Sequence, residues 1–313
     1  NLIYSLNATV PVFLVIVVGY VLKKIGWITP EFIKVANKIN FKVTLPCLLI
    51  QDLMNTDFRQ EFDGKYILYC MIVTSLCFFA TWTLAKAFLK DKSLVPEFVQ
   101  GSFRGSAAVL GTAFVLNMYG DTGMVPLMII GAVPLYNIYS VIVLTIESPR
   151  REEIEGSPVK NTIKGIVTNP IIIGIVIGLL WSALRLPMPV ILSKTVSKVG
   201  AIASPMGLMS MGATFEFNKA FKKLKPAITA TFFKLIGFAA IFLPMAVGLG
   251  FRNEELVAIL VMLGSATTVS CFVMAKNMGH EGVLSSSVVM LTTMFSAFTL
   301  TMWLFILKSF QLI

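Results

Sequence analysis

Apolar runs, each about as long as a membrane-crossing helix, follow one another along the whole chain, and the charged residues gather in short segments between them. A helix needs about 20 mostly apolar residues to cross the hydrocarbon core of a bilayer. The pattern therefore predicts ten spans, at residues 2–22, 35–53, 66–89, 98–118, 124–146, 163–184, 196–215, 227–251, 256–276 and 283–307.

The composition agrees with this pattern. Hydrophobic residues make up 56% of the chain and charged residues only 13%, whereas an average soluble domain carries about 25% charged residues. The apolar runs are continuous rather than alternating, which excludes a transmembrane β-barrel. We therefore predict an all-α polytopic membrane protein that is embedded in a lipid bilayer.

Basic residues outnumber acidic residues by 26 to 16. If the N-terminus lies outside, the cytoplasmic connections hold more than twice as many Lys and Arg residues as the outer ones. The positive-inside rule then predicts a cell-membrane protein with both termini outside. Because the basic excess reflects this topology, we expect no nucleic-acid partner.

Glycine and proline recur at a spacing of 159 residues, whereas random placement would give about one match. The pairs are Pro11/Pro170, Gly19/Gly178, Pro30/Pro189, Pro46/Pro205, Gly105/Gly264, Gly120/Gly279 and Gly123/Gly282. We interpret the chain as two repeats, residues 1–147 and 163–313, joined by a cytoplasmic loop at residues 148–162. Five spans per repeat is an odd number, so the repeats are inverted, which is typical of secondary transporters. The alternative is a duplication without transport.

The recurring pairs Gly105-Ser106 and Gly264-Ser265 stand near the centres of two predicted spans. Glycine costs about 1 kcal/mol relative to alanine in a helix, and serine competes for backbone hydrogen bonds. We predict that both helices are discontinuous there and cross at mid-membrane. The alternative is that these small residues only let helices pack closely.

A helix that restarts at such a break directs N–H groups, equivalent to roughly half a positive charge, toward the centre of the membrane. Two such ends would bind an anion, commonly a carboxylate. No Asp or Glu lies near the breaks, which favours an anionic cargo and leaves coupling to protons or sodium unsupported. The predicted substrate-binding residues are Arg104, Gly105, Ser106, Asn137, Gly264, Ser265, Thr267, Thr268 and Ser270.

Some polar residues have more than one interpretation. Arg104 either binds a substrate carboxylate or the unwound backbone, or it extends toward the cytoplasmic face. Asn137 either lines the cavity or bonds a neighbouring helix. Lys234 is expected to extend to the membrane surface, and Asp52 and His280 to be solvated. The sequence holds no catalytic, phosphate-binding or metal-ligand motif, so we expect no enzyme activity, metal site or cofactor.

Stretches along the whole chain resemble the auxin efflux carrier family, within the bile acid/auxin carrier-like transporter superfamily. The strongest are Asn-Pro-Ile-Ile-Ile-Gly-Ile-Val-Ile-Gly-Leu-Leu at 169–180 and Ala-Ser-Pro-Met-Gly-Leu-Met-Ser-Met-Gly-Ala at 203–213. Leu-Pro-Cys-Leu-Leu at 45–49, Phe-Arg-Gly-Ser at 103–106 and Cys-Phe-Val-Met-Ala-Lys at 271–276 support them.

The resemblance implies a scaffold of spans 1, 2, 6 and 7 and a moving transport domain of spans 3–5 and 8–10. It also implies an elevator-type motion, a homodimer, and small organic anion cargo such as malate, malonate or auxin-like weak acids. This sequence departs from the family where proline is usual at the crossing, because Gly105 and Ser106 stand there in one span and Gly264 and Ser265 in the other.

We therefore predict a secondary transporter of small organic anions. Two alternatives stay open. One is a sodium- or proton-coupled carrier of a neutral or steroid-like substrate on the same fold. The other is a sensor that binds its ligand without moving it.

Overall fold

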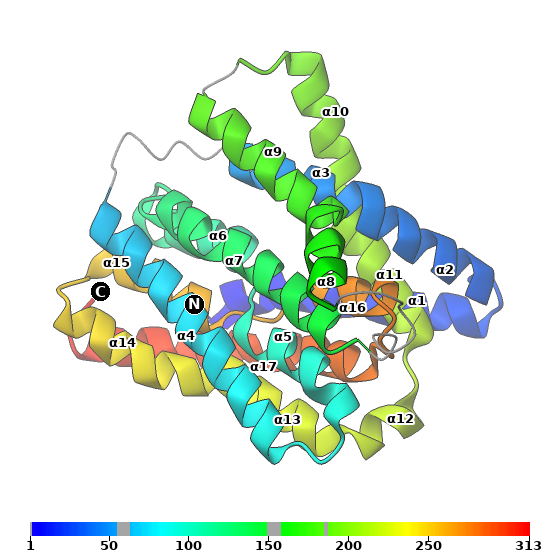
Figure 1. The fold of residues 1–313 in the computed structure, drawn as a ribbon. Helices are drawn as coiled ribbons and strands as arrows, with labels where there is room; N and C mark the ends of the chain where they lie inside the picture. Colours follow the sequence, from blue (N-terminus) through cyan, green and yellow to red (C-terminus); the bar gives the residue numbers. More distant parts are fainter. Residues whose placement is uncertain (1, 55–62, 149–157, 185–186) are drawn as a thin grey trace.

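The fold comes from a computed structural model, which describes residues 2–54, 63–148, 158–184 and 187–313. Every regular element among these residues is a helix, as predicted. Figure 1 shows their arrangement. The elements are α1 (Leu2–Lys24), α2 (Pro30–Ile39), η1 (Asn40–Thr44), α3 (Leu45–Met54), α4 (Gly64–Phe88), η2 (Lys92–Leu94), α5 (Val95–Phe103), α6 (Ala107–Tyr119), α7 (Val125–Ile146), α8 (Pro158–Val167), α9 (Pro170–Leu184), α10 (Val190–Ala201), α11 (Ala203–Thr214), α12 (Phe217–Lys222), α13 (Leu224–Phe232), η4 (Phe233–Gly237), α14 (Phe238–Gly248), α15 (Asn253–Gly264), α16 (Ser270–Asn277) and α17 (Val283–Ser309).

Four of the described helical stretches are long and apolar enough to cross a membrane: Gly64–Phe88, Val125–Ile146, Leu224–Gly248 and Val283–Ser309. They coincide with four of the predicted spans and support a polytopic membrane protein. The count of ten spans and the inverted repeat stay predictions. Most of the predicted connecting loop, residues 149–157, lies outside the described residues.

Two prolines stand where helices become irregular. Pro46 has no N–H to give to the Lys42 carbonyl, and the turn before it, η1, is π-helical. Pro205 leaves the Ala201 carbonyl without its helical donor in the same way, and the chain divides nearby into α10 and α11. The other π-helical turn, η4, contains no proline, and we have no physical account of why it forms.

Small residues let one group of helices approach closely. A Cβ at Gly19 of α1 would lie 2.2 Å from the Met209 carbonyl oxygen of α11, and a Cβ at Gly212 of α11 would lie 2.0 Å from the Ile16 carbonyl oxygen of α1. Helix α3 packs against both α9 and α10, with Gly178 of α9 close to its backbone. We call α1, α2, α3, α9, α10 and α11 the first helix group.

A second helix group, which consists of α4–α7 and α13–α17, packs around α5 and α17. Helix α5 contacts α4, α7, α13 and α17, and α15 contacts α6, α14 and α17. The first group meets the second where α1 packs along α17 and where α11 packs against α16. The candidate functional site lies at this junction between the groups.

Two helices of the second group are interrupted, as the Gly-Ser pairs predict. Residues 104–106 separate α5 from α6, and residues 265–269 separate α15 from α16. The backbone is extended at both departures from the helix, with ψ of 145° at Arg104 and 160° at Ser265. The second break is longer than the Gly-Ser pair that predicts it, since α16 starts only at Ser270.

Candidate functional site

The two interruptions touch each other. The Ser106 N–H donates to the Ala266 carbonyl across 2.8 Å, so the two non-helical segments are joined backbone to backbone. We call residues 104–106 and 265–269 together the crossover. Backbone that leaves a helix inside a membrane protein must find other partners, and this bond supplies one of them.

Further hydrogen bonds tie the crossover to the helices around it. The Thr267 hydroxyl donates to the Gly101 carbonyl of α5 across 2.7 Å, and the Thr267 N–H donates to the Thr292 hydroxyl of α17 across 3.0 Å. The Gln100 amide of α5 donates to the Cys271 carbonyl of α16 across 3.0 Å. The end of α5 and the start of α16 are therefore held side by side.

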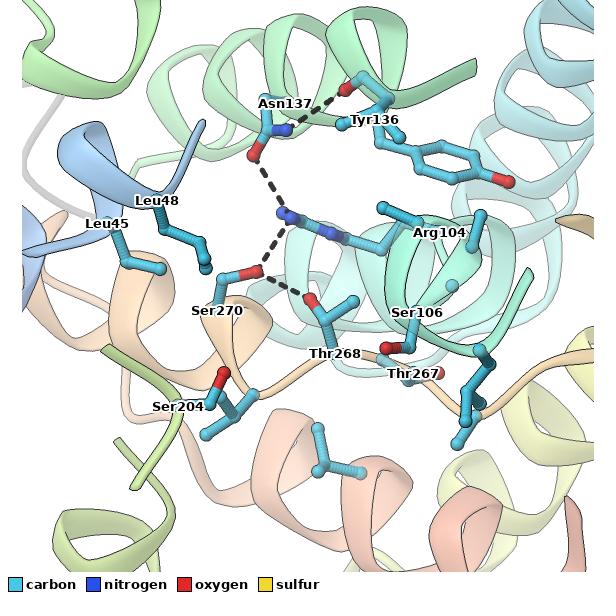
Figure 2. A pocket seen from close by; sticks show the side chains of 18 of the residues that line it. Leu45, Leu48, Arg104, Ser106, Tyr136, Asn137, Ser204, Thr267, Thr268 and Ser270 are labelled. Atoms are coloured by element: carbon cyan, nitrogen blue, oxygen red, sulfur yellow. Dashed lines mark hydrogen bonds between the residues drawn. The ribbon is translucent and has the colours of Figure 1, made fainter. Parts of the chain in front are cut away.

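The Arg104 side chain joins three helices at the crossover and is only 3% exposed. Its Nη2 donates to Asn137 Oδ1 of α7 at 3.0 Å and to Ser270 Oγ of α16 at 2.7 Å. Its Nη1 donates to Ser140 Oγ at 3.2 Å and contacts Met274 Sδ at 3.0 Å. Figure 2 shows the guanidinium held between Asn137 and Ser270. The interpretation in which Arg104 extends to the cytoplasmic face is wrong.

The electrostatic consequence follows from the partners of Arg104. All the hydrogen-bond partners that the described residues supply are neutral, and Nε has none. Arginine cannot lose its proton in a protein, and a buried charge is costly unless an opposite charge accompanies it. The Arg104 guanidinium therefore leaves a positive field at the crossover.

Asn137 and Ser270 orient the guanidinium and also line the cavity beside it. The Asn137 Nδ2 donates back to the Val133 carbonyl of its own helix at 2.9 Å, which directs its oxygen toward Arg104. The Ser270 hydroxyl also hydrogen-bonds the Thr268 hydroxyl. Asn137 therefore lines the cavity and also bonds Arg104 at the end of α5, so it does more than connect two helices.

The start of α6 faces the same cavity. Ser106, Ala107 and Ala108 line it, and the first N–H groups of a helix have no intrahelical acceptor. The Ser106 hydroxyl makes no capping bond to its helix. The N-terminal end of α6 therefore presents backbone donors and a hydroxyl group to the cavity.

The start of α16 is built differently. The N–H groups of Cys271 and Phe272 donate to the Thr268 and Val269 carbonyls at 3.1 and 3.0 Å. These amides are occupied by a tight turn, so α16 contributes the Ser270 hydroxyl to the cavity rather than these two backbone donors. The two helix starts, which the sequence treats as equivalent, are not equivalent in the structure.

Steric space explains one of the two glycines. A Cβ at Gly105 would lie 2.5 Å from Ser265 Oγ and 2.7 Å from Lys234 Nζ, which is far closer than side chains approach one another. A Cβ at Gly264 would meet its nearest atom, the Leu235 carbonyl oxygen, at 3.6 Å, an ordinary van der Waals contact. Only Gly105 is required by the packing of the crossover.

Lys234 is the residue that sequence analysis missed. It is fully buried, and its Nζ donates to the Met262 and Leu263 carbonyls at 3.0 and 2.9 Å. The expectation that it extends to the membrane surface is wrong, because the last carbonyls of α15 lack helical donors and the lysine supplies them. No local sequence signal marks this contact, since the helices are joined only by folding.

A cavity of about 250 Å³ lies against the crossover. Among the predicted binding residues, Arg104, Gly105, Ser106, Asn137, Thr267, Thr268 and Ser270 line it, whereas Gly264 and Ser265 do not. Its size is just below the range of about 300–1,000 Å³ that holds drug-sized ligands. The space therefore suits a small molecule.

The two helix groups supply different walls of this cavity. The crossover and α7 give most of its polar side chains, whereas the first group gives the apolar side chains of Leu45, Leu48, Ile171 and Leu208, with Ser204 of α11 beside them. Asp52, at the end of α3, also lines the cavity and is only partly exposed. The prediction of a solvated Asp52 therefore holds only in part.

Two further polar residues are buried at helix ends. Both Glu97 carboxylate oxygens accept N–H groups at the start of α17, from Gly282 and Ser285, at 2.8 Å each. The His280 ring Nε2 hydrogen-bonds the Leu144 carbonyl at 2.9 Å, and the residue is only 6% exposed. The prediction of a solvated His280 is wrong, and both side chains connect helices rather than face the cavity.

Comparison with protein families gives a match over nearly the whole chain. A family described as membrane transport protein matches residues 4–304. A search of curated proteins finds no match.

Proposed function

The chain belongs to the membrane transport protein family, which includes the auxin efflux carriers, and from this premise we propose that it is a secondary transporter of small organic anions. The proposed cargo is a carboxylate such as malate, malonate or an auxin-like weak acid. Of these, the apolar side chains of Leu45, Leu48, Ile171 and Leu208 in the cavity favour a weak acid with an apolar body, which they can contact.

The observation that carries the proposal is the buried guanidinium of Arg104 at the cavity, bonded only to neutral groups among the described residues. An arginine fork matches the two oxygens of a carboxylate. A carboxylate that enters the cavity would supply the charge that the protein itself does not place on Arg104. The N-terminal end of α6 adds backbone N–H donors and the Ser106 hydroxyl, and its partial charge is positive, like the charge of Arg104.

We further propose an elevator-type mechanism in ten spans arranged as two inverted repeats. The interrupted helices, which meet at the crossover, support this proposal, as does a cavity walled by one helix group on each side. The second group would carry the anion past the first. In the same proposal, the first group forms a homodimer in the cell membrane, with both chain termini outside.

The direct test is uptake of labelled malate, malonate or indole acetate into proteoliposomes that contain the purified protein. Arg104→Gln should lower uptake at least about tenfold, because a hydrogen bond to a charged group contributes about 1.5–3 kcal/mol. The matched control is Lys225→Gln, which removes a positive charge from an exposed site on α13 and should leave uptake unchanged.

Two results would contradict the proposal. One is the absence of flux for a broad panel of weak acids while the protein remains folded by thermal unfolding. The other is an Arg104→Gln variant that transports the cargo as fast as the unmodified protein.

A further inference from the structure

The C-terminal end of α15, at the break, binds a positively charged side chain of the same protein, that of Lys234. The Lys234 side chain is fully buried and reaches the carbonyl oxygens of Met262 and Leu263. The C-terminal end of a helix carries about half a negative charge on such unsatisfied carbonyls. Half-helix ends of this kind, in mid-membrane, are where transporters coordinate sodium ions.

A third oxygen borders the same small space. The Ser265 hydroxyl is fully buried, and it has no hydrogen-bond partner among the described residues. The position that a Cβ of Gly105 would take lies 2.5 Å from that oxygen and 2.7 Å from Lys234 Nζ. A buried hydroxyl without a partner needs an explanation, and here it gives the space a third oxygen that the Lys234 ammonium does not bond.

The local backbone directs Lys234 to this place. It lies in the π-helical turn η4, and π-turns within α-helices occur often at functional sites. The neighbouring Leu235 carbonyl is held by the Trp303 indole at 3.1 Å, and the Met262 carbonyl also accepts the Tyr136 hydroxyl at 2.9 Å. Contacts with other helices therefore hold in place the backbone next to Lys234 and one of the carbonyl oxygens that it bonds.

We infer that Met262, Leu263 and Ser265 form a monovalent-cation site, and that the Lys234 ammonium occupies it permanently. The ammonium donates to two of these three oxygens, the Met262 and Leu263 carbonyls, and oxygen atoms are also the ligands of hard metal cations. The tethered ammonium takes the place that a sodium ion would otherwise fill. This inference goes beyond the proposed function and holds for any cargo, because occupancy of the site is measured without a substrate.

The test compares thermal unfolding of purified variants in sodium chloride and in choline chloride of equal ionic strength. Lys234→Ala removes the ammonium and leaves the oxygens. It should unfold at least about 5 °C lower than the unmodified protein in choline, and sodium should restore stability in a saturable way, since a ligand that binds only the folded state stabilises it. The unmodified protein should show no saturable response to sodium.

Three further variants make the test specific. Lys234→Met fills the space without a charge and should stay destabilised in both salts. Adding Ser265→Ala to Lys234→Ala should weaken the apparent sodium affinity about tenfold or more, because one ligand is lost. Lys225→Ala removes an exposed lysine of α13 and should behave like the unmodified protein.

A saturable sodium response of the unmodified protein would overturn the inference, because the site would then be open. So would a Lys234→Ala variant that sodium, potassium and lithium all fail to stabilise, or one that cannot be purified in either salt. An absence of anion uptake would contradict the proposed function alone and would leave the sodium result valid.

Discussion

Among single residues, the crossover depends on Gly105, because any side chain there would collide with its neighbours. Gly105 leaves the space in which Ser265 Oγ and Lys234 Nζ lie, whereas Gly264 borders only ordinary contacts. The two glycines match at the 159-residue spacing of the predicted repeat, yet one is a steric requirement and the other is a weak point in a helix. An added methyl group should therefore be tolerated at Gly264 but not at Gly105.

Gly105→Ala should lower uptake severely and destabilise the protein by about 1–3 kcal/mol, the usual cost of overpacking. The added methyl group displaces Lys234 from the α15 carbonyls. Gly264→Ala is the matched control, with near-normal uptake and stability, because its Cβ finds 3.6 Å of space. Proteoliposome uptake and thermal unfolding of both variants check this. Equal tolerance of the two substitutions would show that the steric argument is wrong.

At the scale of helices, the ends are stabilised by side chains from other elements. Glu97 of α5 accepts the first N–H groups of α17, and Lys234 donates to the last carbonyls of α15. Each charge opposes the partial charge of the helix end that it meets. The interrupted bundle therefore uses long-range contacts where a continuous helix would satisfy its own backbone.

Glu97→Gln should lower the free energy of unfolding by about 1–3 kcal/mol, because one charge-assisted bond is lost and a buried N–H is left without an acceptor. Thermal unfolding measures this change. The control is Glu216→Gln, at an exposed glutamate that pairs only with Lys219 on the surface, where an ion pair contributes at most about 1 kcal/mol. A similar loss in both variants would contradict the capping role of Glu97.

Helices α1 and α11 pack closely because Gly212 of α11 has no side chain. Gly212→Ala places a methyl group 2.0 Å from the Ile16 carbonyl oxygen, so the helices must separate, at a cost of about 1–3 kcal/mol. Gly248→Ala, where nothing lies within 4 Å of the added Cβ, should leave the unfolding temperature unchanged or slightly raised. An unaffected Gly212→Ala variant would contradict the close packing of α1 and α11.

At the scale of the whole molecule, the proposed mechanism requires the two helix groups to move past each other. They meet closely at α11 and α16, where a Cβ at Gly207 would lie 3.2 Å from Val273 Cγ2. Because Cγ2 is one bond from the Val273 Cβ, cysteines at positions 207 and 273 would have Cβ atoms near the separation of about 3.5–4.5 Å found in disulfides. A covalent bond here would prevent the movement.

In a chain whose four native cysteines have been replaced, Gly207→Cys combined with Val273→Cys should cross-link under mild oxidation and lose at least about nine-tenths of its uptake. Reduction should restore the uptake, and each single variant should be insensitive to the oxidant. Gel mobility after proteolysis reports the cross-link. Full uptake by the cross-linked protein would exclude a relative movement of α11 and α16.

The helical class, the four spans that the described helices support, and the places where two helices break can all be predicted from local sequence. These properties are local. A run of apolar residues predicts a span because of its transfer energy, and a Gly-Ser pair weakens the helix at its own position. The residues next to the two breaks, such as Arg104 and Ser270, could therefore be singled out from the sequence alone.

Which side chains meet at the crossover depends on how the helices pack, and this could not be predicted. Lys234 looks like a lysine that reaches for the membrane surface, and Asp52 and His280 look like solvated residues, because sequence spacing does not show which helix lies opposite a side chain. The contact between Lys234 and the end of α15 joins residues 28 and 29 positions apart, and Arg104 meets Ser270 across 166 positions. Packing of whole helices brings these groups together, and no local pattern encodes that packing.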